Sequence, residues 1–210
     1  MDIKEKGVLV QIGTNNGADE FNEIVRKSSP VKIVLVEPNK ALNSFVYKNY
    51  EGVENVILEN VAITERDGDE VELVHPIGIT DGMKESGAVY TTEHFSLLPL
   101  DDWGSDLVRI STRTMTFNTL CKKHGIDHVH YLQIDTEGYD SEIIKSIDFD
   151  KIKIDIIKYE DWSFPEDCFS RYGEDRKKYG VNGMRDVKAL LESRGYALTT
   201  EARDIIAVKI

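Results

Sequence analysis

The amino-acid sequence predicts an α/β fold, with a mostly parallel seven-stranded sheet, helices on both faces and a C-terminal antiparallel hairpin. Two observations support this fold. Short β-branched runs alternate with segments of helical periodicity, which is typical of a parallel sheet. The last two apolar runs are separated by only four residues, and strands that close together pair antiparallel. A chain of 210 residues suits one hydrophobic core, so residues 1–210 are expected to form a single domain.

Three βα-type units are predicted in the N-terminal part. The strands are expected at Val8–Ile12, 31–36 and 55–59, and the helices at 18–27 and 40–50. Within 18–27, Phe21, Ile24 and Val25 recur at helical spacing, and Ser28-Ser29-Pro30 ends the helix. Three such units in succession favour the α/β class.

The middle of the chain is less regular. A strand is predicted at 70–75, and the stretch from 76 to about 110 is rich in Gly, Ser and Asp with scattered aromatic residues. A stretch of this kind indicates a lid or a binding insertion. The remaining elements are strands at 110–116, 129–134 and 152–159, helices at 117–123 and 184–193, and the hairpin strands at 196–200 and 205–210.

Composition narrows the classes of partner and the cellular location. The formal net charge of −12 disfavours a phosphate backbone, so nucleic acid is not an expected substrate. No signal-peptide core or long apolar run is present, which predicts a cytoplasmic protein without a membrane span. Cys121 and Cys168 lie far apart and lack metal-ligand spacing, so both are expected to be reduced.

The candidate ligand site lies where predicted strands end, because doubly wound sheets bind ligands beyond the carboxyl ends of their strands. Gly13-Thr14-Asn15-Asn16-Gly17 follows the first strand, and its glycines allow a close approach of the backbone to a ligand. Glu37 ends the second strand, twenty positions after Gly17, where a carboxylate can accept both hydroxyls of a ribose. Together they predict an adenosine-containing cofactor.

The spacing of the glycines separates two such cofactors. Gly13-x-x-x-Gly17 lacks the GxGxxG pattern that a dinucleotide pyrophosphate requires. The amino-acid end of S-adenosylmethionine requires only polar groups such as those of Asn15. S-adenosylmethionine is therefore favoured, while an NAD-dependent oxidoreductase and a non-catalytic binding domain on the same fold stay as alternatives.

Four segments resemble the FkbM-type family of class I S-adenosylmethionine-dependent methyltransferases. They are Ile12-Gly13-Thr14-Asn15-Asn16-Gly17, Val36-Glu37-Pro38-Asn39, Asn60-Val61-Ala62-Ile63 and, most distinctively, Leu132-Gln133-Ile134-Asp135-Thr136-Glu137-Gly138. Gln133 departs from the lysine that is usual in the family, and Thr116-Phe117-Asn118 departs from Thr-Leu-Asp. The resemblance implies the Rossmann-like class I methyltransferase fold and O-methyl transfer to a hydroxyl of a sugar or glycan.

The resemblance also implies roles for single residues. The cofactor residues are Gly13, Thr14, Asn15 and Gly17 near the methionine end, Glu37 on the ribose, Asn60 and Ala62 near the adenine, and Asp135. Asp135, beside the expected methyl group, is the first choice for the general base. Its alternative role is to cap the helix at 139–145, unless Glu137 caps that helix instead.

Further carboxylates and aromatic side chains complete the expected site. Glu160 and Asp161 end the fifth strand and, with Asp135, could bind a divalent cation, as in a related group of metal-dependent sugar methyltransferases. The cation is not favoured. Without it, neighbouring carboxylates would raise one another's pKa, which equally suits a general base near neutral pH. Glu137, Glu160 and His94 are the further catalytic candidates. The acceptor is expected at Tyr90, His94, Trp103, Trp162, Arg171 and Tyr172.

The other four histidines, His75, His124, His128 and His130, show no metal spacing and are expected at the surface. The expected partner is a small-molecule or glycan acceptor. The sequence leaves open a homo-oligomer or a place in a longer glycan-modifying polypeptide.

Overall fold

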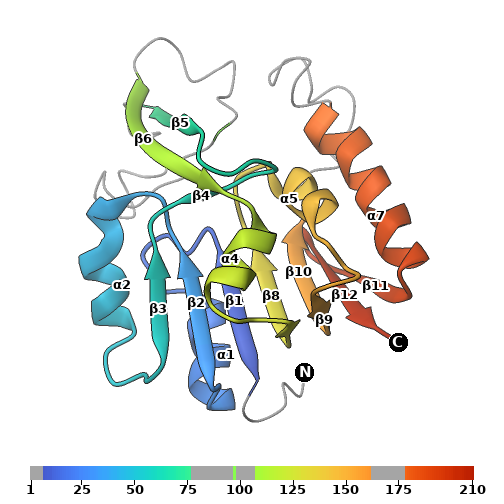
Figure 1. The fold of residues 1–210 in the computed structure, drawn as a ribbon, viewed down its shortest axis with the longest axis horizontal. Coiled ribbons are helices and arrows are strands. Elements are labelled where there is room, and N and C mark those ends of the chain that lie inside the picture. The colour runs from blue at the N-terminus through green and yellow to red at the C-terminus, as the bar shows by residue number, and fades with distance from the viewer. Residues whose placement is uncertain (1–6, 77–96, 98–106, 162–177) are drawn as a thin grey trace.

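The main sheet contains the seven strands that the sequence predicts, in the order β11-β12-β10-β8-β1-β2-β3 (Figure 1). This computed structural model describes residues 7–76, 97, 107–161 and 178–210. The strands are β1 (Val8–Ile12), β2 (Lys32–Val36), β3 (Val56–Glu59), β8 (Tyr131–Ile134), β10 (Ile156–Glu160), β11 (Tyr196–Glu201) and β12 (Asp204–Lys209). β12 pairs antiparallel with both of its neighbours, β10 and β11, and all the other pairs are parallel. The predicted parallel sheet with its C-terminal hairpin is confirmed.

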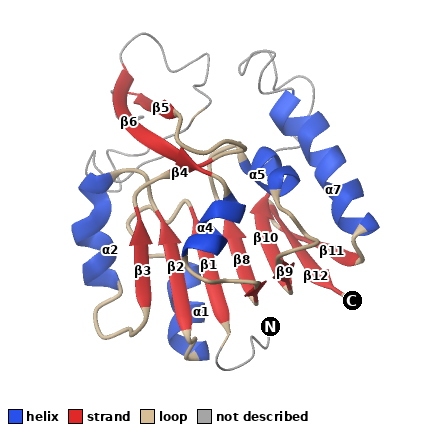
Figure 2. Cartoon of the chain, in the orientation of Figure 1, coloured by secondary structure: helices blue, strands red, loops and turns tan. Residues whose placement is uncertain are grey.

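Helices cover both faces of this sheet (Figure 2). They are α1 (Glu20–Ser28), the short helix η1 (Lys40–Leu42), α2 (Asn43–Asn49), α4 (Phe117–Lys123), α5 (Asp140–Ser146), the π-helical turn η4 (Lys178–Asn182) and α7 (Gly183–Ser193). Side chains alternate along a strand, so neighbouring residues of β1 belong to different core clusters. Leu9 packs in the cluster that contains Phe21 of α1 and Val46 of α2. Its neighbour Val10 belongs to the cluster on the other face, with Phe117 of α4.

The strand order reverses between β1 and β8. From β1 the chain builds outward through β2 and β3, and it then returns to form β8 on the other side of β1. Ile12 at the end of β1 pairs with Val36 of β2 and with Ile134 of β8. The loops after these three strands therefore meet at the topological switch point, which is where open α/β sheets bind ligands.

Two predicted strands are each broken in two. The prediction at 129–134 becomes β7 (His128–Val129) and β8, and the prediction at 152–159 becomes β9 (Lys153–Ile154) and β10. The breaks fall at His130 and Asp155, where the pairing partners change. β7 pairs with β9, whereas β8 pairs with β1 and β10. Such a change of partner is not visible in the pattern of a single strand.

A second, smaller sheet lies above the carboxyl ends of the main strands (Figure 1). It contains β4 (Ala62–Ile63), β5 (Glu70–Pro76) and β6 (Leu107–Met115), in the order β4-β6-β5. The strand predicted at 110–116 thus begins earlier, because Leu107 to Arg109 find partners on β5. Most of the predicted insertion at 76–110 lies outside the described residues. Within the described parts, no helix has the length and apolar character needed to cross a bilayer.

Candidate active site

A pocket lies at the topological switch point, and we call it the switch-point pocket. Five of the predicted cofactor residues line it, namely Gly13, Asn15, Glu37, Ala62 and Asp135. The lining also includes residues that the sequence analysis did not single out for the site: Ile12, Val36, Pro38, Leu42, Val61, Ile63, Leu73, Leu97, Thr136 and Tyr139. Most of these are apolar, so the pocket combines apolar walls with a few polar groups, as is usual for cofactor sites.

Gly13 brings the first loop against the end of β8. Its φ is +83°, and a Cβ atom placed there would lie 1.7 Å from the backbone oxygen of Asp135. Both facts require glycine, since other residues rarely adopt this φ and cannot fit this contact. The backbone N–H groups of Gly13 and Thr14 donate to the oxygen of Val36, at 3.0 and 3.1 Å. The three strand ends are therefore locked together.

Asn15 and Thr14 carry polar atoms that the described residues do not satisfy. Asn15 adopts a left-handed φ of 52°, and its N–H donates to Oε2 of Glu37 at 2.8 Å. The Oδ1 atom of Asn15 and the Oγ1 atom of Thr14 are both buried without a hydrogen-bond partner among the described residues. Buried polar atoms are normally paired. Asn15 lines the switch-point pocket and Thr14 does not, so it is Oδ1 of Asn15 that fits a ligand with hydrogen-bond donors, such as the amino-acid end of S-adenosylmethionine.

Glu37 is held by backbone groups on both of its carboxylate oxygens. Oε2 accepts from Asn15, and Oε1 accepts from the N–H of Asn39 at 2.8 Å. Burial raises the pKa of Glu37 to about 7, and the two backbone hydrogen bonds oppose this rise. A carboxylate oxygen can accept more than one hydrogen bond. Glu37 can therefore accept from a pair of ribose hydroxyls without losing its own loop contacts.

Three predicted cofactor residues do not line the pocket, namely Thr14, Gly17 and Asn60. Asn60 donates from Nδ2 to the backbone oxygen of Glu37 at 2.7 Å and exchanges amide hydrogen bonds with Asn43, both at 2.9 Å. It links the ends of β2 and β3 to α2, and Val61 and Ala62 line the pocket after it. A Cβ atom at Gly17 would lie 2.9 Å from Cε2 of Tyr50, so Gly17 allows the loop to pack on α2.

The helix-cap alternative for Asp135 and Glu137 is wrong. Helix α5 begins at Asp140, with Tyr139 at the N-cap position, so neither acid occupies that position. Asp135 instead follows β8 and lines the switch-point pocket, as does Glu137 with its left-handed φ of 55°. Both carboxylates are therefore placed at the pocket wall, where the sequence analysis expected chemistry.

Asp140 is a buried acid that the sequence analysis missed. It is fully buried, and burial raises its pKa to about 6. Its Oδ2 accepts from Oγ1 of Thr136 at 2.7 Å, and its Oδ1 accepts from the N–H of Glu160 at 3.4 Å. Asp140 thus ties the loop after β8 to the end of β10. Its position two residues after Asp135-Thr136-Glu137-Gly138 was the available signal.

A second pocket, the polar pocket, shares Asp135 and Glu137 with the first. Its other lining residues are Glu20, Gln133, Ile134, Lys158, Glu160, Arg203 and Asp204. They come from β8, β10, the start of α1 and the turn of the C-terminal hairpin. Carboxylates outnumber cations in this lining, so the pocket favours neutral or cationic ligands over anions.

Glu160 is an acid of the polar pocket whose pKa is raised. Burial is the main reason that its pKa rises to about 7, and Glu137, Asp140 and Asp204 raise it further. The Arg203 guanidinium opposes this rise, with its Nη2 atom 2.7 Å from Oε1 of Glu160. A carboxyl group that titrates near neutral pH suits proton transfer.

The predicted three-acid metal site is not supported. Asp161 does not line either pocket, and its Oδ2 lies 2.8 Å from Nζ of Lys188 on α7. Among the described residues, the group with ligand atoms close enough for a metal ion excludes Asp135, Glu160 and Asp161. The remaining predicted residues, His94, Tyr90, Trp103, Trp162, Arg171 and Tyr172, lie outside the described residues.

Comparison with known proteins agrees with this fold. The family described as methyltransferase FkbM domain matches residues 11–198. A methyltransferase FkbM from Methylobacillus flagellatus KT superposes with a TM-score of 0.53 at 7% identity, over 99% of this chain and 44% of that one. The O-methyltransferase from Bacillus cereus in complex with SAH gives 0.50 at 12% identity, over 96% and 74%. This chain therefore spans less than half of the first of these proteins. No curated protein sequence matches the chain.

Proposed function

The chain belongs to the FkbM-domain methyltransferase family, and from this premise we propose that it transfers a methyl group from S-adenosylmethionine to a hydroxyl of a sugar or glycan. One observation carries the proposal. The switch-point pocket and the polar pocket share Asp135 and Glu137, so a cofactor in the first would face an acceptor in the second. Methyl transfer requires such an in-line arrangement of donor and acceptor.

Different residues of the switch-point pocket would contact different parts of the cofactor. Bound S-adenosylmethionine supplies an electrophilic methyl group on a sulfonium. Glu37 would accept from the ribose hydroxyls, and Val61 and Ala62 belong to the apolar wall that suits the adenine. Asn15, with its unsatisfied buried Oδ1, would accept from the methionine end.

Asp135 is the proposed general base, because it lies on the boundary between the two pockets. A carboxylate there can accept the proton of the acceptor hydroxyl while it aims the oxygen toward the first pocket. Glu160 is the second candidate for this role, and its pKa of about 7 supports it. The two residues can be separated by their effects on the pH dependence of the rate.

The lining of the polar pocket supports a neutral, hydroxyl-rich acceptor. Sugar hydroxyls donate well to carboxylates, and Asp135, Glu137, Glu160 and Asp204 supply them. The same carboxylates repel phosphate groups, which agrees with the net charge of −12. The nicotinamide alternative is disfavoured by both the loop spacing and the family match.

Mass spectrometry with a methyl-labelled donor tests this proposal. The protein would be incubated with neutral sugars and glycans, with phosphorylated sugars as the contrasting set. We expect label on an ether oxygen of a neutral acceptor, and a loss of about 100-fold or more in Asp135→Asn. Asp148→Asn is the matched control, since Asp148 pairs with Lys151 and lines neither pocket. Label only on nitrogen, carbon or a phosphorylated acceptor would refute the acceptor assignment.

A further inference from the structure

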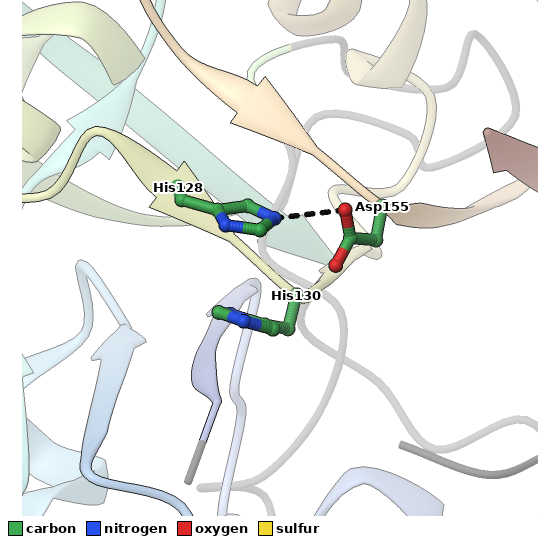
Figure 3. A group of neighbouring side chains, drawn as sticks. All are labelled: His128, His130 and Asp155. Atoms are coloured by element: carbon green, nitrogen blue, oxygen red, sulfur yellow. Dashed lines mark hydrogen bonds and ion pairs between the residues drawn. The ribbon is translucent and has the colours of Figure 1, made fainter. Parts of the chain in front are cut away.

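A second candidate site lies at the amino ends of the central strands, away from the switch-point pocket, around His128, His130 and Asp155 (Figure 3). His128 begins β7, His130 directly precedes β8, and Asp155 lies between β9 and β10. β7 and β9 are parallel partners, with Val129 opposite Ile154. Two residues that are two positions apart on a strand point to the same side, so both histidines face away from the buried Val129.

The three side chains already contact one another. Nε2 of His128 lies 2.8 Å from Oδ1 of Asp155, and the two histidine rings stack with centroids 4.1 Å apart. Figure 3 shows His128 pointing toward Asp155, with the His130 ring alongside. One potential ligand atom from each residue lies within 4.8 Å of those of the other two. The spacing of the histidines along the chain gives no sign of this grouping, which the fold creates by bringing His128 and His130 close to Asp155.

The backbone around the cluster is fixed by hydrogen bonds between strands. The N–H of His130 donates to the oxygen of Val8 at 2.8 Å, and the N–H of Val8 donates to Nδ1 of His130 at 3.0 Å. The N–H of Asp155 donates to Val129 at 3.0 Å. A Cβ atom at Gly7 would lie 2.8 Å from Cγ of His130, so the ring packs directly on this glycine. The backbone at His130 and Asp155 is thus held in place before any ion binds.

We propose that His128, His130 and Asp155 bind a divalent transition-metal ion, with Zn²⁺ as the reference ion. Two imidazole nitrogens and one carboxylate oxygen are a ligand set that zinc and its neighbours in the series accept. The ion replaces the proton shared by His128 and Asp155. Because His130 must give up its hydrogen bond from Val8, we expect His128 and Asp155 to be the stronger ligands.

The side chains must rearrange locally to share one ion, because the stacked rings of His128 and His130 have to turn until one nitrogen of each faces it. Tetrahedral zinc with bonds of about 2.0–2.1 Å separates its ligand atoms by roughly 3.4 Å, so the 2.8 Å contact between His128 and Asp155 must open by about half an ångström. Their side chains are 38% and 42% exposed, which leaves room for this movement and for entry of the ion.

The metal site is separate from the active site. His130 precedes β8, whereas Asp135 follows it, and five extended residues span about 16 Å. An ion at His128 and Asp155 would therefore join the amino-terminal edges of neighbouring strands without touching the switch-point pocket. Its expected role is to stabilise the fold, and the inference does not depend on the proposed reaction.

Calorimetric titration of metal-free protein with Zn²⁺ tests the site, with Co²⁺ absorption as a second readout. We expect a single ion to bind and to raise the unfolding temperature. His128→Ala and Asp155→Asn should each weaken binding by at least about tenfold, and His130→Ala should weaken it less. The control is His124→Gln, because His124 also pairs with a carboxylate, that of Glu59 at 2.7 Å.

Two results would overturn the proposal. One is the absence of both Zn²⁺ binding and a Co²⁺ spectrum in the wild-type protein. The other is wild-type affinity in both His128→Ala and Asp155→Asn, which would place the ion elsewhere. Unfolding temperatures without metal show whether each variant is folded. If His128→Ala does not fold, the near-isosteric Asp155→Asn still tests the site.

Discussion

Replacing Glu37 by glutamine should weaken cofactor binding strongly. The substitution keeps the size of the side chain but removes its charge and one of its two acceptor oxygens. Hydrogen bonds to charged groups contribute about 1.5–3 kcal/mol each. Since an amide keeps part of this interaction, two ribose hydroxyls should lose roughly 2–4 kcal/mol in total, which is about 30- to 700-fold in Kd.

The effect should also depend on pH. Burial raises the pKa of Glu37 to about 7, so about half of this group is already protonated at pH 7 in the free protein. Ribose hydroxyls donate to the ionised form. Wild-type affinity for S-adenosylmethionine should therefore rise with pH through about 7 and then level off, while Glu37→Gln shows no such rise. The difference between the two proteins is expected to be largest near pH 8.

Isothermal titration calorimetry at several pH values measures both effects. The matched control is Glu59→Gln, which makes the same change at the end of the adjacent strand β3. Glu59 pairs with Lys123 and His124 and does not line the switch-point pocket. Its variant should bind like the wild type. A Glu37→Gln protein that is folded and binds within about threefold of the wild type at every pH would refute the role of Glu37.

Three further predictions follow from the site. Gly13→Ala should lower the free energy of unfolding by more than about 2 kcal/mol in urea denaturation. Gly68 has nearly the same φ, +82°, but no atom lies within 4 Å of a Cβ atom placed there, so Gly68→Ala should lower it by only about 1 kcal/mol. Equal losses would contradict the close contact between Gly13 and Asp135. Asp140→Ala should cost about 1–3 kcal/mol in the same assay, because Thr136 and Glu160 lose a buried acceptor, and no loss would exclude this linking role. If Glu160 is the base, the rate should rise with pH through about 7, and Glu160→Gln should remove that limb of the pH profile; an unchanged limb would assign it to another group.

The parts of the site that could be predicted are those carried by short, local segments. The loop at Gly13, the acid at Glu37 and the strand end at Asp135 are each defined within a few residues. The order of strands and helices then indicates that these segments meet at one edge of the sheet. That is why five of the predicted cofactor residues line one pocket.

The parts that could not be predicted depend on contacts between distant segments. Leu73 lines the pocket from the second sheet, whose pairing with residues about 40 positions later leaves no local pattern. Asn60 does not line the pocket. It bonds instead to Asn43 and to the backbone oxygen of Glu37, and so links the ends of β2 and β3 to α2. The approach of His128 to Asp155 likewise exists only because β7 pairs with β9.

Thermal unfolding with S-adenosylmethionine, its demethylated product and NAD tests the central claim most directly. A ligand at about 100 times its Kd stabilises the folded state by about 2.7 kcal/mol. For a domain of this size, that corresponds to a rise of about 5–11 °C in Tm. S-adenosylmethionine and its product should both produce such a rise, and NAD should produce none. Stabilisation by NAD alone would contradict the assignment of this chain as an S-adenosylmethionine-dependent methyltransferase.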